Sequence, residues 1–384
     1  MLLKKIKVLR HKLYLWHFRR APLQNNKILL WSDNFKSFGC SPKYMAQYLL
    51  KQYPGVYDLV WVFDTAVSVP EDFPDGIRVV RYFSIEYLKE ISTAKFIICN
   101  ARTGRGHYFD KREGQIYIQT WHSSLRLKKI EGDTADTLPQ SYIEAAKADS
   151  AKIDLLLSGC RFSTEIFRRA FWYDGVILEG GTPRCDLFFN QDESHVREKV
   201  FRQYDLAPNT KLALYAPTFR NNKQAQTHGM DFVALKDALE QKTGDSWIIG
   251  CRLHPNIQKD AALDGVISMT RYPDMQELLG ASDCLITDYS SCMFDMAIAG
   301  KPCFLYVPDL DEYTSHERGL YFNIMELPFP ICCGMDMLED SVRNFDKSAY
   351  QKQINLFLQK TGSYEDGHAA ARVAEYIVKA QKYG

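Results

Sequence analysis

Short apolar runs alternate with longer stretches of helical periodicity along most of the chain. In the first half, apolar runs bounded by polar loops predict buried strands at residues 27–31, 59–63, 79–80, 96–99, 116–118, 153–157 and 176–178. Stretches with helical spacing lie between several of them, at residues 41–50, 84–92, 140–150 and 163–172. Strands that alternate with helices predict a parallel sheet covered on both faces.

The same alternation starts again in the second half of the chain. A charged helical stretch at 193–204 and the dipeptide Pro208-Asn209 indicate a domain boundary. Strands are then predicted at 212–215, 247–251, 284–286 and 303–307, and helices at 292–299, 348–360 and 369–382. Residues 308–319, rich in charge, are predicted to form a loop.

A chain of 384 residues is long enough for two domains of this kind. We therefore expect an α/β protein with two doubly wound parallel-sheet domains, at residues 26–190 and 205–360. Residues 361–384 would form a C-terminal helical segment able to cross back onto the first domain.

Composition narrows the class of protein. The chain is 46% hydrophobic and 25% charged, a globular profile, and its net charge of +1 provides no general attraction to nucleic acid. Its ten cysteines include no Cys-x-x-Cys pair, which indicates reduced thiols and no zinc site. No glycine-rich phosphate loop or dinucleotide fingerprint is present, which argues against an ATPase or a dehydrogenase.

The first 25 residues are unusually basic. Residues 2–20 contain seven lysines or arginines and no acid, interleaved with aliphatic and aromatic residues. As a helix, this segment can lie on an anionic membrane surface. The alternative is an ordinary first helix that packs on its own domain. No apolar run in the chain approaches the length of a transmembrane helix.

Two strand ends of the first half carry candidate site residues. His122 comes just after the strand at 116–118, where a histidine can act as a general base; a hydrogen-bonded structural histidine is the alternative. Gly181 and Arg184 follow the strand at 176–178. A glycine lets the backbone approach a ligand and a guanidinium can grip phosphate, although the same residues can also form a tight turn between domains.

Three strand ends of the second half carry a second set of polar residues. These are Thr218 with Arg220, Arg252 with His254, and Asp288 with Ser290 and Ser291. Parallel strands open on the same edge of a sheet, so the three sets are expected to meet there. Two cations, several hydroxyls and an acid one helical turn further on, Asp295, suit a nucleoside diphosphate. Alternatively, the two serines only cap a helix.

The charged loop at 308–319 offers a further set of candidates. Asp311 and Glu312 are paired acids that can bind hydroxyls, and Arg318 can bind a phosphate. A solvated surface loop is the alternative reading of the same residues.

In this order, these segments resemble the CDP-glycerol glycerophosphotransferase family, which includes the teichoic-acid primases and polymerases. The resemblance extends from about residue 32 to 372 and rests on residues 119–122, 181–184, 216–220, 252–255, 287–291 with 294–295, 309–313 and 318–319. It implies a GT-B fold of two Rossmann-like domains facing a cleft. It also implies transfer of an alditol phosphate from a CDP-alditol to an acceptor hydroxyl, with release of CMP, by a peripheral enzyme at the cytoplasmic face of the bacterial membrane.

Roles follow for the matched residues. We assign His122 as the base on the acceptor hydroxyl and His254 as the group that supports the leaving CMP. Phosphate contacts are assigned to Thr218, Arg220, Arg252, Ser290 and Ser291, and the ribose contact to Asp295. The expected partners are CDP-glycerol or CDP-ribitol, a lipid-linked saccharide or polymer acceptor, and an anionic membrane surface. No cofactor is required, although Mg²⁺ on the pyrophosphate is compatible with the pattern.

One departure concerns the residues after His122. The family usually has Gly-Thr or Gly-Gly there, whereas this chain has Ser123-Ser124. The spacing to Lys128-Lys129 resembles members from capsule and related surface-polymer loci, and the acceptor and the alditol stay open. Two alternatives remain: a GT-B glycosyltransferase that uses a nucleotide sugar, and a catalytically silent membrane scaffold, against which the presence of both histidines argues.

Overall fold

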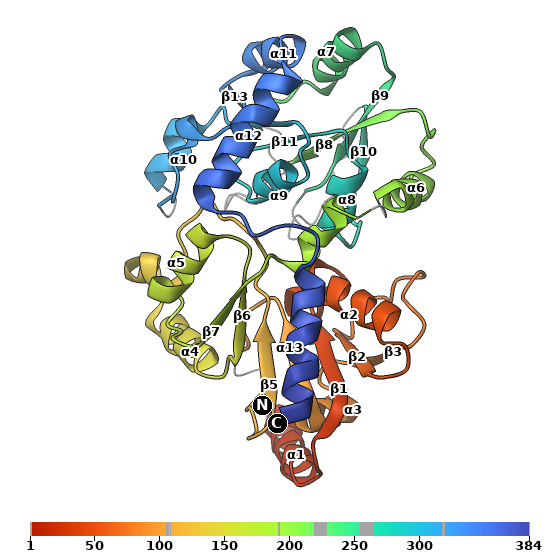
Figure 1. The fold of residues 1–384 in the computed structure, drawn as a ribbon, viewed down its shortest axis with the longest axis vertical. Helices are drawn as coiled ribbons and strands as arrows, with labels where there is room; N and C mark the ends of the chain where they lie inside the picture. The colour runs from red at the N-terminus through yellow and green to blue at the C-terminus, as the bar shows by residue number, and fades with distance from the viewer. Residues whose placement is uncertain are drawn as a thin grey trace. The chain divides into compact units, whose positions relative to one another are not determined.

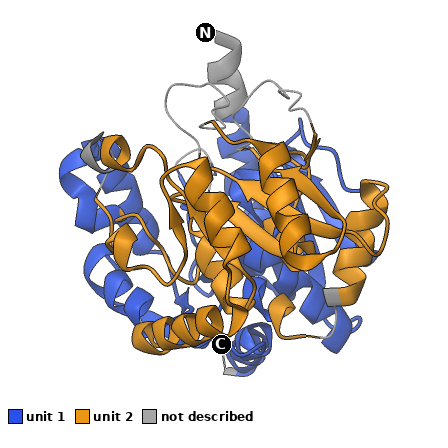
Figure 2. Cartoon of the chain, turned by 90° about the horizontal axis from the view of Figure 1, so that it is seen from above, with its two compact units in different colours: residues 1–122, 131–186, 364–384 blue, residues 123–130, 187–363 orange. Residues whose placement is uncertain are grey.

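The computed structural model describes residues 2–104, 107, 109–190, 193–218, 229–253, 265–316 and 319–383. The chain divides into two compact units, which Figure 2 colours separately. Unit 1 comprises residues 1–122, 131–186 and 364–384, and unit 2 comprises residues 123–130 and 187–363. Each unit is built around its own sheet (Figure 1).

Unit 1 contains a seven-stranded sheet in the order β3-β2-β1-β4-β5-β6-β7, and every described pair is parallel. The strands are β1 (Gln24–Trp31), β2 (Asp58–Phe63), β3 (Ile77–Arg81), β4 (Ala94–Cys99), β5 (Ile116–Gln119), β6 (Leu155–Ser158) and β7 (Val176–Glu179). Their continuous apolar runs fit a sheet that is buried on both faces, as β4 is along its whole length.

Six helices are described in unit 1. They are α1 (Leu2–Phe18), α2 (Cys40–Gln52), α3 (Ile85–Thr93), α4 (Gln140–Ser150), α5 (Arg161–Ala170) and α13 (Ala369–Tyr383). The last helix packs on the sheet of unit 1, where Val373 and Ile377 join the hydrophobic core (Figure 1). The carboxylate of Asp186 accepts the N–H groups of Ala369 and Ala370, at 3.0 and 2.8 Å, and so caps α13.

Unit 2 contains a six-stranded parallel sheet in the order β10-β9-β8-β11-β12-β13. Its strands are β8 (Lys211–Ala216), β9 (Trp247–Cys251), β10 (Val266–Ser268), β11 (Cys284–Thr287), β12 (Cys303–Tyr306) and β13 (Ile331–Cys332). Its helices are α6 (Glu193–Gln203), α7 (Phe232–Thr243), α8 (Met275–Ala281), α9 (Cys292–Ile298), α10 (Leu310–His316), α11 (Met335–Arg343) and α12 (Lys347–Thr361).

These two parallel sheets confirm the predicted α/β fold class. The prediction of a loop across residues 308–319 is wrong, because helix α10 occupies most of it. Asp311 and Glu312 lie in the first turn of α10, where carboxylates stabilise the positive end of the helix dipole. Stabilisation of α10 therefore accounts for these two carboxylates.

An ion-pair cluster at the start of β2 and β3 makes unit 1 sensitive to acid. Arg78 donates two hydrogen bonds of 2.8 Å to the carboxylate of Asp58, and these bonds lower the pKa of Asp58. Such a carboxylate stabilises the fold above the ordinary aspartate pKa of about 3.9, and this stability is lost as the pH falls through the lowered value.

Asp58→Asn is therefore expected to lower the melting temperature at pH 7, and the difference from the wild type should shrink at pH 3. Thermal unfolding at the two pH values measures this. The exposed Asp75→Asn is the matched control and should show no such convergence. An Asp58→Asn difference that stayed constant with pH would rule out the ion pair as its source.

Candidate active site

His122 lies in a loop directly after β5, and side-chain contacts fix the backbone of this loop. Gln119 accepts the N–H of Trp121 through its side-chain oxygen at 3.0 Å, and the Thr120 N–H donates to the Cys99 carbonyl at 2.9 Å. Trp121 adopts a left-handed backbone conformation with φ +52°, which turns the chain sharply. The His122 ring is exposed and stacks on the Trp121 ring at a centroid distance of 4.3 Å.

The tautomer of His122 is set by Asn100, the residue that follows β4. Its Nδ1 lies 3.1 Å from the carbonyl oxygen of Asn100, which can only accept, so Nδ1 carries the proton and donates. Asn100 is itself held by Asp33, whose N–H donates to the Asn100 side chain at 2.8 Å. The lone pair of the neutral ring is therefore on Nε2, the arrangement that a general base requires.

Arg184 lies behind this loop. It is only 7% exposed, and its guanidinium donates to the carbonyl oxygen of His122. The sequence suggested a phosphate as the partner of Arg184, but in this structure Arg184 supports the backbone of His122. A role as a phosphate ligand stays a prediction.

Gly181 packs against the C-terminal segment of unit 1. Its φ is +86°, and a Cβ atom added there would lie 2.9 Å from a carboxylate oxygen of Glu365 and 3.2 Å from the Cβ of Ala369. The neighbouring Thr182 donates its N–H and its hydroxyl to the same carboxylate, at 3.0 and 2.9 Å. The glycine thus allows a close approach within the protein, and its contact with a ligand stays a prediction.

Gly181→Ala is expected to lower the free energy of unfolding by about 1–3 kcal/mol, since it adds backbone strain and a crowded Cβ. Gly244→Ala is the matched control, because Gly244 has φ +74° and no atom within 4 Å of an added Cβ. Chemical unfolding of both variants separates crowding from strain. Equal losses would show that the packing on Glu365 contributes nothing.

In unit 2, the three predicted strand ends do lie side by side. Strand β8 is hydrogen-bonded to β9 and to β11, with Tyr215 opposite Cys251 and Ala216 opposite Thr287. The loops that follow these strands therefore leave from one edge of the sheet. Thr218, Arg252 and Asp288 lie in those loops, as the sequence predicted.

Asp288 ties two of these loops together. It is 3% exposed, and its carboxylate accepts the Thr218 N–H at 2.8 Å, the Thr218 hydroxyl at 2.6 Å and the Tyr289 N–H at 2.6 Å. Both the N–H and the hydroxyl proton of Thr218 are thus directed to Asp288. This pair shapes the edge of the sheet, and direct contact of either residue with a nucleotide stays a prediction.

Asp295 lies on the next helix, α9, and the two serines directly precede that helix. Asp295 is 2% exposed, and it accepts a 3.0 Å hydrogen bond from the side-chain amide of Gln276 on α8. The ribose contact assigned to it stays a prediction. Ser290 and Ser291 are half-buried where α9 begins, and Ser291 makes no side-chain cap hydrogen bond within α9.

Residues 123–130 form a strap that belongs to unit 2 although they directly follow His122. The Leu127 carbonyl accepts the Tyr321 N–H at 2.8 Å, and the Lys129 N–H donates to the Gly319 carbonyl at 2.9 Å. The Leu127 N–H also donates to the hydroxyl oxygen of Ser291 at 3.4 Å. The segment after His122 is therefore anchored on the elbow that was assigned to phosphate.

The strap could not be predicted from the sequence, since its partners lie almost two hundred positions away in the chain. An aromatic layer supports it: the Lys128 ammonium lies 5.3 Å from the ring centroid of Tyr313, which stacks on Tyr289 at 3.5 Å. The Lys128-Lys129 pair stood out in the sequence, but it did not indicate which residues the strap contacts.

Three assigned residues, Arg220, His254 and Arg318, lie outside the described residues. Among the residues that are described, no group of three or more histidine, cysteine or carboxylate side chains is arranged to hold a metal ion. The compatibility of Mg²⁺ with the pyrophosphate site stays a prediction.

Two parallel-sheet α/β units place the chain in the GT-B class of folds. A UDP-GlcNAc 2-epimerase from Neisseria meningitidis shares this fold with a TM-score of 0.53 at 12% identity, over 92% of this chain and 100% of that one. The chain belongs to the CDP-Glycerol:Poly(glycerophosphate) glycerophosphotransferase family, whose sequence model matches residues 13–379. The resemblance drawn from the motifs is thereby confirmed.

Named relatives make the family likeness concrete. The chain is 35% identical to a teichoic acid poly(glycerol phosphate) polymerase of Staphylococcus epidermidis, over 92% of this chain and 50% of that protein. It is 31% identical to a teichoic acid glycerol-phosphate transferase of Staphylococcus aureus, over 97% and 98% of the two chains. The solved structure of the wall teichoic acid polymerase TagF matches with a TM-score of 0.83 at 32% identity, over 100% and 98%.

The lengths of these relatives differ. This chain spans about half the length of the polymerases of Staphylococcus epidermidis and Bacillus subtilis, at 50% and 53%, and nearly all of the Staphylococcus aureus transferase, at 98%. The expected closeness to capsule-locus members stays a prediction, because the relatives named here are teichoic acid enzymes.

Proposed function

We propose that the protein transfers an alditol phosphate from a CDP-alditol to a hydroxyl of a membrane-linked glycan or poly(alditol phosphate), and releases CMP. Glycerol phosphate is the alditol phosphate that we propose. The observation that carries this proposal is the Nδ1 hydrogen bond from His122 to Asn100 in a chain of this family. Relatives named as glycerol-phosphate polymerases and transferases support it, as do TagF crystals soaked with CDPG.

In the proposed reaction, Nε2 of His122 accepts the proton of the acceptor hydroxyl. The oxygen attacks the phosphorus next to the alditol, a new P–O bond forms, and the bond to the CMP oxygen breaks. His254 is assigned to the leaving CMP as a hydrogen-bond donor or acid. Such a transfer depends on position and charge neutralisation more than on covalent catalysis.

Donor contacts are proposed at the β9-β8-β11 edge of unit 2. Arg252 follows β9 and supplies a cation. Ser291 accepts the Leu127 N–H, which leaves its hydroxyl proton to donate to a phosphate oxygen. Because Thr218 donates both its N–H and its hydroxyl proton to Asp288, we assign it the role of positioning the loop that leads to Arg220.

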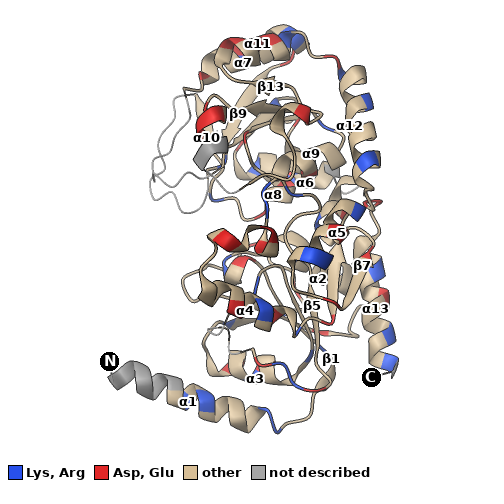
Figure 3. Cartoon of the chain, turned by 90° about the vertical axis from the view of Figure 1, so that its left-hand side faces the viewer, with Lys and Arg blue, Asp and Glu red and all other residues tan. Residues whose placement is uncertain are grey.

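A peripheral position at the cytoplasmic face of the membrane is proposed from α1. The sequence of this helix contains lysine and arginine but no acid, and Figure 3 shows no acidic residue on its described part. It packs against α3, yet Leu9, Leu13 and Trp16 are 61%, 60% and 57% exposed. Among the described helices, none is long and apolar enough to cross a membrane.

The test is CMP release by the purified protein with CDP-glycerol and, separately, with CDP-ribitol, each with a lipid-linked saccharide acceptor. Release with one donor identifies the alditol. If neither donor yields CMP, calorimetric titration of both donors follows; failure of both to bind, together with turnover of a nucleotide sugar, would replace this proposal by the glycosyltransferase alternative.

A further inference from the structure

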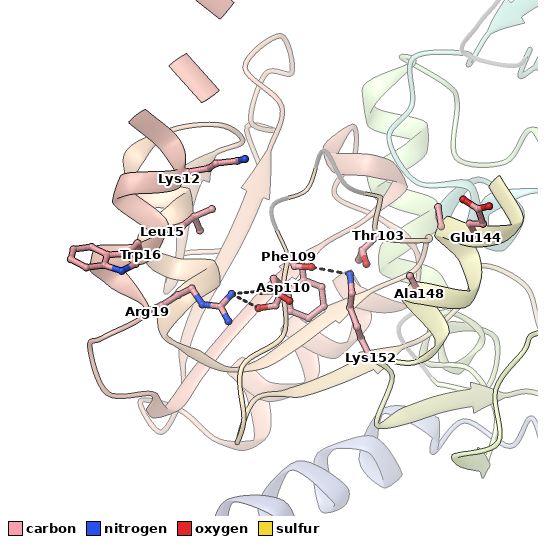
Figure 4. Close-up of a pocket in the computed structure, with 11 residues that line it drawn as sticks. Lys12, Leu15, Trp16, Arg19, Thr103, Phe109, Asp110, Glu144, Ala148 and Lys152 are labelled. Atoms are coloured by element: carbon pink, nitrogen blue, oxygen red, sulfur yellow. Dashed lines mark hydrogen bonds and ion pairs between the residues drawn. The ribbon is translucent and has the colours of Figure 1, made fainter. Parts of the chain in front are cut away.

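Two cavities adjoin each other in unit 1. The inner cavity, of about 400 Å³, is lined by His122 and its neighbours. The outer cavity, of about 500 Å³, lies between α1 and α4 (Figure 4). Both are lined by Thr103 and Ala145, so together they lead from the basic first helix to His122.

The outer cavity combines apolar walls with cations. Leu15 and Trp16 of α1, Phe109, and Ala148 of α4 supply apolar surface. Its basic residues are Lys12, Arg19 and Lys152, and its acidic residues are Asp110 and Glu144. Three cations face two carboxylates, and the lining therefore has a surplus of positive charge beside apolar surface.

Contacts within the outer cavity fix two of the three cations in place. Arg19 donates to the Asp110 carboxylate at 2.9 Å, and Lys152 donates to the Phe109 carbonyl at 2.9 Å (Figure 4). Lys12 is exposed on α1. An occupant that matches this lining carries a phosphate and a long apolar chain.

The inner cavity differs in charge. The cation of Arg102 is matched by Glu131 and Asp149, at 3.2 and 3.3 Å. Burial lowers the pKa of His107, which keeps that ring neutral at pH 7. Among the described lining residues, the rest of the surface is formed by neutral polar and aromatic groups such as Asn34, Trp121 and Tyr142. This lining suits a polyol better than a phosphate.

We infer that the two cavities form one binding site for a lipid-linked acceptor. The outer cavity holds the phosphate that joins the acceptor to its long-chain alcohol, and the inner cavity holds the uncharged polyol whose hydroxyl faces His122. This inference rests on the proposed function and deepens it, because it gives the acceptor a defined site in unit 1. It also explains why apolar residues of α1 adjoin a basic cavity.

Filling the outer cavity tests the inference. Ala148→Trp on α4 is expected to raise the KM for a lipid-linked acceptor by about tenfold or more. An increase of this size is expected when a few contacts are lost. The KM for the CDP-alditol, and turnover of a short water-soluble acceptor, should not change. Ser141→Trp is the matched control, since Ser141 is an exposed residue of the same helix that lines neither cavity. Equal KM values for both variants would overturn the inference.

Direct binding gives a second readout that does not depend on turnover. Dodecyl phosphate, below its critical micelle concentration, is titrated into the wild type, Ala148→Trp, the double variant Lys12→Gln/Lys152→Gln and the control Lys51→Gln/Lys379→Gln, whose two lysines are exposed elsewhere on unit 1. We expect about tenfold weaker binding in Ala148→Trp and in Lys12→Gln/Lys152→Gln, and wild-type binding in the control. Unchanged binding in both would overturn the site.

Two further arms of the titration separate the sources of phosphate. Inorganic phosphate should bind far more weakly than dodecyl phosphate, because it cannot use the apolar walls. Anionic phospholipid vesicles should bind Ala148→Trp and the wild type equally, because α1 keeps its exposed residues. Vesicle binding that fell with Ala148→Trp would assign the cavity to bulk lipid instead. Ala148→Trp could weaken dodecyl phosphate binding while no CDP-alditol yields CMP. That result would overturn the proposed reaction, whereas the proposed binding site would stand.

Discussion

Alditol phosphate transfer by His122→Ala is expected to fall by about 10²–10⁴-fold, the usual contribution of a positioned general base. The side chain is exposed, and Arg184 donates to the backbone carbonyl of His122, a contact that the substitution keeps. The variant should therefore fold normally. Binding of the CDP-alditol should be unchanged, because the assigned donor contacts belong to unit 2.

Initial rates of CMP release, together with calorimetric binding of the donor, measure both effects. His195→Ala is the control, since the imidazole of His195 is 79% exposed on α6. Near-normal transfer by His122→Ala would mean that another group takes the acceptor proton.

Asp288→Ala is expected to lower the free energy of unfolding by about 2–4 kcal/mol, because two N–H groups and a hydroxyl lose a buried acceptor together. The same variant should raise the KM for the donor, since the loops after β8 and β11 are no longer tied. Urea unfolding and steady-state kinetics measure the two effects.

Asp245→Ala, at an exposed position beyond α7, is the matched control for stability and should leave both quantities unchanged. Thr218→Ser keeps the hydroxyl and the N–H that Asp288 accepts, and it should behave almost as the wild type. A stable Asp288→Ala protein with an unchanged KM would show that the tie between the loops does not shape the donor site.

Much of the fold was predictable, because the signals for it are local. Apolar runs such as 247–251 match strand β9 residue for residue, and the helical stretch 140–150 matches α4. The meeting of the β9, β8 and β11 ends followed from a general rule of parallel sheets. Helix α8 was missed, and so was β13, whose two residues are too few for an alternation to show.

The partners of the site residues were not predictable, because tertiary contacts decide them. Nothing near Arg184 in sequence indicates that its guanidinium reaches the His122 carbonyl. Nothing near Asp295 indicates that Gln276 binds its carboxylate. A charged residue beside a strand end suggests a ligand from sequence alone, whereas the folded chain often uses that charge to hold a neighbouring loop.

The strap illustrates a further limit of sequence patterns. Residues 123–130 have no strand signal, yet they bridge antiparallel to the segment around Leu320 and contact Ser291. The family difference at Ser123-Ser124 falls at the start of this strap. The departure noted in the sequence thus lies at the buried start of the strap.

The most direct test of alditol phosphate transfer is the linkage in the product. The protein is incubated with CDP-glycerol and an acceptor, and the purified product is analysed by phosphorus NMR. A new phosphodiester between glycerol and the acceptor, formed in equal amount to the CMP released, is the expected result. A product with a glycosidic linkage and no new phosphorus would contradict the assigned reaction.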